Sequence, residues 1–171
     1  MIKLADTRLL RTSAYVNGKW MAAQSGKTLE VRNPANADLL GTVPDCGGAE
    51  TRTAIEAAEA ALPAWRARTA SDRAALLRRL HALILANQED LATLMTAEQG
   101  KPLAEARGEI AYAAAFVEWF AEEARRVYGD VIPGHAKDRR IVVIRQPVGV
   151  VAAITPWNFP SAMLARKLAP A

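Results

Sequence analysis

An apolar run near the end of the chain constrains its fold more than any other feature. The run extends from Val148 to Ile154, and it has the length and β-branched content of a strand that is buried on both faces. Such a strand needs neighbouring strands at its sides and helices above and below it. The sequence therefore predicts an α/β fold with an open sheet.

A rigid turn is expected directly after this strand. Pro156 ends the strand because proline has no N–H to donate to a ladder, and Pro160 fits the first turn of a helix, where the missing N–H costs little. Trp157 and Asn158 lie between the two prolines, at the carboxyl edge where open α/β sheets bind ligands. We therefore expect this turn to be part of a functional site.

The first 46 residues carry the pattern of a β arm. Residues 1–14 give weak signals, and an irregular segment is expected there. Asn-Gly between strand formers predicts a hairpin with a type I′ turn over Tyr15–Trp20. Two further short strands are predicted at 28–32 and 39–43, each stopped by a proline nearby. These strands form an arm rather than a domain with its own core.

Helical periodicity follows the arm. Apolar residues recur at spacings of three and four, and Pro63 should fray or kink the end of the first helix. Ser71 is a good N-cap for the second helix, and Gly100 is placed to end it in a left-handed cap. The predicted helices run over 51–65, from Ser71 to Gly100, and from Pro102 to Gly129. A strand is expected at 141–144.

Composition and charge exclude several classes of protein. The chain is 51% hydrophobic and 23% charged, which is typical of globular proteins. No apolar run approaches the roughly 20 residues of a membrane span, and no signal-peptide core follows Met1. A cytoplasmic protein without membrane contact is expected. The net charge is +4, but acidic residues interleave with the basic ones and no aromatic platform accompanies them, which favours solvated helix faces over nucleic-acid binding.

The single cysteine and the two histidines show no catalytic or metal-binding pattern. Pro44, Asp45 and Gly47 surround Cys46 and supply no base, so we interpret Cys46 as a loop residue and not a nucleophile. His81 lies in a leucine-rich helix and His135 in a loop. No metal site is predicted.

Several motifs resemble those of one enzyme family. Pro156-Trp157-Asn158-Phe159-Pro160, following Pro147-Val148-Gly149-Val150, is similar to the hallmark of the aldehyde dehydrogenase superfamily. Other segments agree in order and spacing: Tyr15–Trp20, Asn33–Ala35, Glu98–Pro102 and Phe116–Glu123. Within the superfamily, the chain most resembles bacterial succinate-semialdehyde dehydrogenases.

The resemblance implies an aldehyde dehydrogenase-like α/β fold, of which this chain is expected to be an incomplete N-terminal portion. The reason is that the chain reaches Ala171 before a crossover could form a second parallel strand. The expected parts are a β arm (1–46), the helical part of the cofactor-binding domain with three long helices (47–130), a connecting, oligomerisation-type strand (131–147), and the first strand of a Rossmann-like sheet with the start of its helix (148–171).

The resemblance also implies a reaction. An aldehyde is oxidised to a carboxylic acid by NAD or NADP: a cysteine thiolate attacks, hydride leaves to the nicotinamide, and water hydrolyses the thioester. Succinate semialdehyde, an intermediate of 4-aminobutyrate degradation, is the expected substrate. Glutarate semialdehyde or an aminoaldehyde is an alternative substrate, and a non-catalytic oligomerisation module is an alternative function. Relatives form dimers or tetramers.

Relatives carry their catalytic cysteine, general-base glutamate, ribose-binding lysine and Gly-rich cofactor turn beyond the position of Ala171. We therefore expect the chain alone to be inactive. The choice between NAD and NADP depends on residues near the adenosine ribose and is left open.

The resemblance assigns catalytic and cofactor roles to the turn. Asn158 matches an oxyanion donor, and an amide suits this role because its charge does not change with pH. The alternative is that Asn158 only caps the following helix. Ile154, Thr155, Pro156 and Trp157, together with Asn158, match the lining of the cofactor cleft. The alternative is that these residues only form the packed end of a strand.

The resemblance assigns substrate binding to three further residues. Arg166 matches an arginine that holds the distal carboxylate of semialdehydes, which a guanidinium can bind bidentately. Its alternative is a surface arginine beside Lys167. Phe159 and Met163 match tunnel-lining positions, although helical spacing alone would place them in a core. Glu98 and Lys101, near a helix end, are interpreted as structural.

Overall fold

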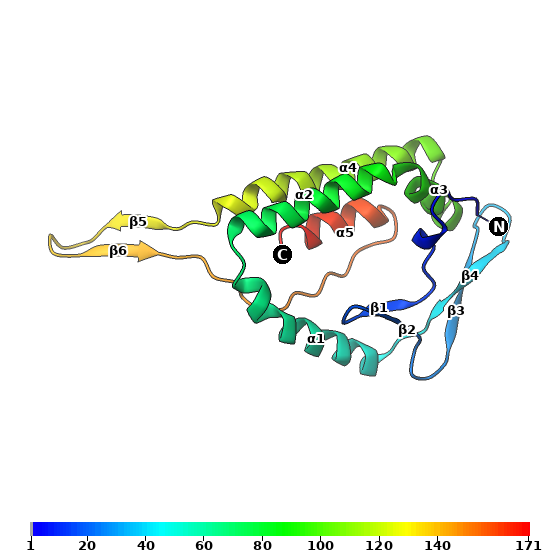
Figure 1. Ribbon diagram of the computed structural model, residues 1–171, viewed down its shortest axis with the longest axis horizontal. Helices are drawn as coiled ribbons and strands as arrows, with labels where there is room; N and C mark the ends of the chain where they lie inside the picture. The colour runs from blue at the N-terminus through cyan, green and yellow to red at the C-terminus, as the bar shows by residue number, and fades with distance from the viewer. Residues whose placement is uncertain (1) are drawn as a thin grey trace.

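The computed structural model describes residues 2–171 and shows a mixed α/β arrangement (Figure 1). The helices are α1 (Gly48–Arg66), α2 (Ala70–Ala86), α3 (Gln88–Gln99), α4 (Leu103–Glu123) and α5 (Pro160–Leu168), with 3-10 turns η1 (Thr7–Leu9) and η2 (Ala124–Arg126). The strands are β1 (Ala14–Val16), β2 (Lys19–Met21), β3 (Thr28–Arg32), β4 (Leu39–Pro44), β5 (Asp130–Pro133) and β6 (Arg140–Val143). No helix in this part of the chain has the length and apolar character to cross a membrane.

Two hairpins form the predicted β arm. Strands β1 and β2 pair antiparallel, and Asn17 (φ 50°) and Gly18 (φ 75°) both have the positive φ that a type I′ turn requires. Strands β3 and β4 also pair antiparallel, with a register shift between Val31 and Arg32. The hairpin and both strands predicted from the sequence are therefore confirmed.

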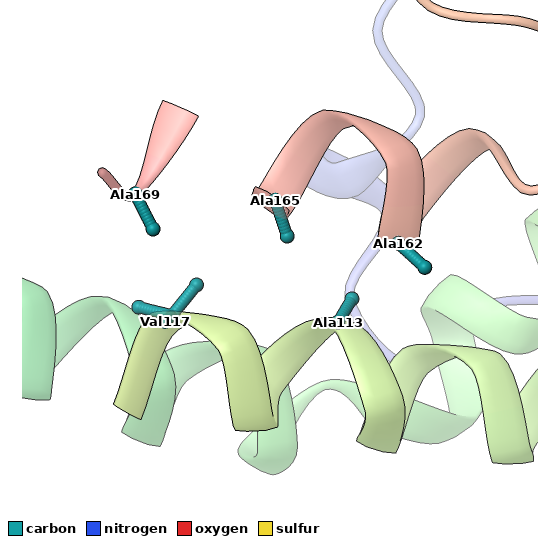
Figure 2. Packing of buried hydrophobic residues seen from close by; sticks show 5 residues of the cluster. All are labelled: Ala113, Val117, Ala162, Ala165 and Ala169. Atoms are coloured by element: carbon teal, nitrogen blue, oxygen red, sulfur yellow. The ribbon is translucent and has the colours of Figure 1, made fainter. Parts of the chain in front are cut away.

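The main core lies between α4 and α5. Ala113 and Val117 of α4 point toward Ala162, Ala165 and Ala169, which come from α5 and its C-cap (Figure 2). The small alanine side chains let the two helix backbones approach closely. Helix α2 runs alongside α4 (Figure 1), and its Leu77, Leu80 and Ile84 pack against the same cluster. This packing fixes the start of α5, and with it the turn that precedes α5.

A second buried cluster joins α3 to α4. Its members are Ala92, Met95, Ala106 and Ile110. Gly100 ends α3 with φ 80°, so the predicted left-handed cap is confirmed. Together, the two clusters hold α3, α4 and α5 in fixed relative positions.

The helix boundaries differ from the prediction in three places. Helix α2 is capped by Thr69, whose hydroxyl accepts from the Asp72 N–H, so the predicted Ser71 cap is wrong. The predicted second helix is two helices, because Asn87 leaves the helical conformation and its side-chain amide donates to the Leu83 carbonyl. Helix α4 ends at Glu123 rather than near Gly129. The three predicted long helices are therefore four.

Pro63 does not stop α1. The helix continues to Arg66, and the Ala67 N–H still donates to the Pro63 carbonyl. The apolar face predicted for this helix is uncovered, with Ile55 and Trp65 exposed.

A long hairpin projects away from the helices (Figure 1). The strand predicted at 141–144 is present as β6, and it pairs antiparallel with β5, which the sequence analysis did not predict. All residues of both strands are exposed, including Val131, Ile132 and Val142.

The predicted buried strand at Val148–Ile154 is not formed in this structure. The segment is irregular, and the exposed fractions are 97% for Val148 and 94% for Ile154. A strand needs a hydrogen-bonding partner, and the three sheets among residues 2–171 are separate hairpins that do not include this segment. The apolar pattern alone cannot supply that partner.

Candidate functional site

The Asn158 turn connects the irregular segment 148–154 to α5. Pro160 occupies the first turn of α5, as predicted, and the N-cap residue is Phe159. The N-cap residue makes no side-chain cap bond, and Asn158 accepts no N–H of α5 through its side chain, so the alternative that Asn158 caps α5 is wrong. The Asn158 side chain is exposed, and its amide has no hydrogen-bond partner among residues 2–171. This leaves the amide free to meet a ligand.

The backbone of Asn158, in contrast, is held firmly. Its carbonyl accepts from Lys101 Nζ at 2.9 Å and from Gln99 Nε2 at 3.3 Å. Both donors come from the junction of α3 and α4, close to the Gly100 cap. The left-handed cap therefore helps to direct two side chains at one carbonyl.

A buried ion pair underlies these contacts. Lys101 Nζ pairs with Glu109 Oε2, and the side chains are only 8% and 1% exposed. Glu109 Oε1 accepts the backbone N–H groups of Ser161 at 2.9 Å and Ala162 at 3.2 Å. Lys101 Nζ also lies 4.0 Å from the centroid of the Phe159 ring. The pair connects α4 to both sides of the turn.

Glu109 was not among the functional residues predicted from the sequence. A signal was present, because Glu109 interrupts the apolar stripe of α4 between Ala106, Ile110 and Ala113. A carboxylate in such a stripe needs a partner when it is buried. The partner could not be identified without the fold.

The predicted cofactor-lining residues form one continuous stretch. Ile154, Pro156 and Asn158 are exposed, Trp157 is 77% exposed, and Thr155 is half-buried. Trp157 also borders a shallow hollow with Pro34, Met95, Glu98, Gln99 and Pro160. Burial raises the pKa of the Glu98 carboxyl above its usual range. The stretch can form one wall of a cleft.

Arg166 is half-buried against α4. Its guanidinium carbon lies 4.8 Å from the Phe116 ring centroid and 5.6 Å from that of Tyr112, and Nη2 donates to the Tyr112 hydroxyl at 3.3 Å. Its Nε is buried without a partner, and no carboxylate among residues 2–171 forms an ion pair with it. These contacts hold the Arg166 guanidinium against α4.

Phe159, Met163 and Arg166 follow one another at spacings of four and three. This spacing places them on one face of α5, with Phe159 and Met163 partly accessible to solvent. The structure thus brings the predicted substrate-binding residues to one face, beginning beside Asn158. Cys46 lies elsewhere, exposed in the connection between β4 and α1. No group of acidic, histidine or cysteine residues suited to a metal occurs in the described part of the chain.

Comparison with known proteins identifies the class to which this fold and turn belong. The family model for the aldehyde dehydrogenase family matches residues 20–171. The chain belongs to this family.

Individual relatives show which aldehyde dehydrogenases the chain is similar to. A glutarate-semialdehyde dehydrogenase of Pseudomonas putida is 64% identical over 170 residues, and a succinate-semialdehyde dehydrogenase [NADP(+)] of Escherichia coli is 61% identical. Each match covers 99% of this chain and 35% of the relative. The crystal structure of an E. coli NADP-dependent enzyme matches with a TM-score of 0.97 at 61% identity, covering 98% of this chain and 35% of that one. The chain therefore spans about a third of the length of these relatives.

Proposed function

We propose that this chain contributes to NAD- or NADP-dependent oxidation of an aldehyde with a distal carboxylate, with succinate semialdehyde oxidised to succinate. The observation that supports this proposal most strongly is the environment of the Arg166 guanidinium. Its guanidinium is held by two aromatic rings, is half-buried, and has no carboxylate partner among the described residues. A desolvated guanidinium with unpaired donors is suited to an anionic group of a substrate.

Asn158 would act at the other end of the substrate. Thiolate attack on an aldehyde produces an oxyanion, which needs a hydrogen-bond donor held at the correct place. The Asn158 amide is exposed and unpaired, while its backbone is fixed by Lys101 and Gln99. Phe159 and Met163 lie on the α5 face between Asn158 and Arg166, where they would line the path of the substrate.

The stretch from Ile154 to Asn158 would form one wall of the cofactor site. Exposed Ile154 and Trp157 offer apolar surface that fits the flat face of a nicotinamide ring. A bound NAD or NADP supplies the hydride acceptor. Two structural neighbours support a nicotinamide cofactor for this chain, because their structures contain NAP and nicotinamide adenine dinucleotide respectively.

The names of the relatives support a class of substrate, and they do not distinguish one substrate within that class. The P. putida and E. coli relatives are named for glutarate semialdehyde and succinate semialdehyde, which differ by one methylene and share the distal carboxylate. Glutarate semialdehyde is therefore the second candidate substrate. A role in 4-aminobutyrate degradation goes with the first candidate.

A hybrid enzyme tests the proposal. Residues 1–171 replace the matching third of the E. coli relative, and the aldehyde-dependent rise in NAD(P)H absorbance is recorded. The substrates are succinate semialdehyde, glutarate semialdehyde and butanal, which lacks the distal carboxylate. We expect Arg166→Gln to lower kcat/KM for the two semialdehydes by about 10- to 100-fold, since hydrogen bonds to charged groups are among the stronger ones. The rate with butanal should change little.

Arg78→Gln is the matched control, because Arg78 pairs with Glu122 on the exposed surface and lies outside the site. It should leave all three rates unchanged. Equal losses with butanal and the semialdehydes in Arg166→Gln would contradict a carboxylate-binding role.

A further inference from the structure

The ion pair between Lys101 and Glu109 is the most deeply buried pair of charges in the described chain. Removing two charges from water is costly, and such a pair is stable only when its remaining polar groups are also satisfied. Here Glu109 accepts from two backbone N–H groups, and Lys101 donates to one carbonyl and faces an aromatic ring. Neither residue is needed by the proposed chemistry itself.

All these contacts converge on one short turn. Lys101 holds the carbonyl of Asn158, and Glu109 holds the N–H groups of Ser161 and Ala162 at the start of α5. The turn is therefore fixed at both ends by the two members of one ion pair. The charge of Glu109 also suits its place, because a negative group is favoured at the N-terminus of a helix.

The Asn158 side chain has no hydrogen bond among residues 2–171 that could fix it directly. Its amide has no hydrogen-bond partner among residues 2–171, so its position follows from that of its own backbone. An oxyanion donor must lie about 2.7–3.1 Å from the developing charge, and a 1 Å misplacement can cost about 100-fold in rate. Small movements of the turn would therefore matter.

We propose that Lys101 and Glu109 are positioning residues that set the Asn158 amide in place for the oxyanion. This inference rests on the proposed role of Asn158 as oxyanion donor. The ion pair touches neither substrate nor cofactor; it acts through the backbone of residues 158–162.

Kinetics of the hybrid enzyme test the inference. Lys101→Met removes the charge and keeps the side-chain length. We expect kcat with succinate semialdehyde to fall by about 10- to 100-fold, with KM changed less than about threefold. Arg107→Met is the control, because Arg107 lies on α4, as Glu109 does, and forms an exposed ion pair with Glu89 of α3. It should leave kcat and KM unchanged.

A double-mutant cycle separates positioning from a general loss of structure. In the Asn158→Ala background, Lys101→Met should lower kcat by less than about twofold, because both changes act through the same donor. An equal loss in both backgrounds would overturn the inference, since Lys101 would then act independently of Asn158.

Hydrogen exchange provides a measurement that does not depend on activity. In Lys101→Met, and in the Lys101→Met/Glu109→Gln variant that leaves no unpaired buried charge, amide exchange across residues 158–162 should accelerate at least about tenfold. Arg107→Met should not accelerate it. Unchanged exchange would overturn the inference even if activity fell. A hybrid without any aldehyde oxidation would contradict the proposed function, while exchange would still decide whether the pair fixes the turn.

Discussion

At the scale of single residues, Asn158 combines a free side chain with a fixed backbone. The amide is exposed and unpaired among the described residues, so replacing it should leave the fold intact. In the hybrid enzyme, we expect Asn158→Ala to lower kcat by about 100- to 1,000-fold, the cost of removing one oxyanion donor. KM and the melting temperature should change little.

Asn36→Ala, in the exposed turn between β3 and β4, is the control for this prediction. It should not change kcat. A melting temperature that falls with Asn158→Ala would instead assign Asn158 a structural role.

The sequence predicted functional roles for the Asn158 turn and for Arg166, but not the contacts that support these residues. Pro156 and Pro160 frame Asn158 through local backbone chemistry, which can be read directly from the sequence. Lys101 reaches Asn158 across 57 positions, and Glu109 reaches Ser161 across 52. Contacts of that separation depend on how α4 packs against α5, so the prediction that Lys101 is structural could not include its partner.

At the scale of elements, the end of α3 depends on Gly100. This residue has φ 80°, and a Cβ atom there would lie 2.9 Å from Pro34 Cγ. We expect Gly100→Ala to lower the free energy of unfolding by about 1–2 kcal/mol, because L-residues are disfavoured in the left-handed region. Urea unfolding measures the change.

Gly108→Ala gives the opposite sign and serves as the control. Gly108 lies inside α4, and no atom is within 4 Å of the Cβ that alanine would add. Alanine should therefore raise the free energy of unfolding by about 0.5–1 kcal/mol. A loss of stability at both positions would show that backbone conformation is not what distinguishes them.

The start of α1 depends on the ionisation of Glu50. Its carboxylate accepts the N–H groups of Gln24 at 2.7 Å and Gly47 at 2.8 Å, and these bonds lower its pKa. The charged form is favoured in the folded state, so this stability is present above the unfolded pKa and is lost as the pH falls through the lowered pKa.

We expect Glu50→Gln to lower the melting temperature at pH 7 and to weaken its fall between pH 5 and pH 3. Glu56→Gln, at an exposed position on the same helix, is the control, and its melting temperature should depend on pH as that of the unchanged protein does. Parallel curves for Glu50→Gln and the unchanged protein would contradict the role of Glu50.

Elements defined by local signals were predicted more accurately than those defined by distant contacts. Asn17-Gly18 and Gly100 determine their turns by backbone conformation, and both predictions are confirmed. The break at Asn87 arises from a side-chain bond to the Leu83 carbonyl that competes with a continuing helix. The Val148–Ile154 strand requires a pairing partner, which apolar periodicity cannot provide.

At the scale of the whole molecule, both strands of the β5–β6 hairpin expose apolar side chains. Val131 and Val142 are cross-strand partners, and both are exposed on an arm that extends away from the helices (Figure 1). Exposed strands with apolar side chains favour pairing with another chain. We propose this hairpin as the surface through which copies of the protein assemble into dimers or tetramers.

The replacement of both valines by lysine tests the assembly surface. Two like charges directly opposite each other repel, and lysine on exposed strands opposes edge-to-edge pairing. We expect the hybrid with Val131→Lys and Val142→Lys to sediment as a smaller species than the unchanged hybrid, measured by sedimentation velocity at equal protein concentration. Leu39→Lys, at an exposed position of strand β4 in the N-terminal β arm, is the control and should not alter the distribution. If the two-lysine variant sediments like the unchanged hybrid, assembly uses a different surface.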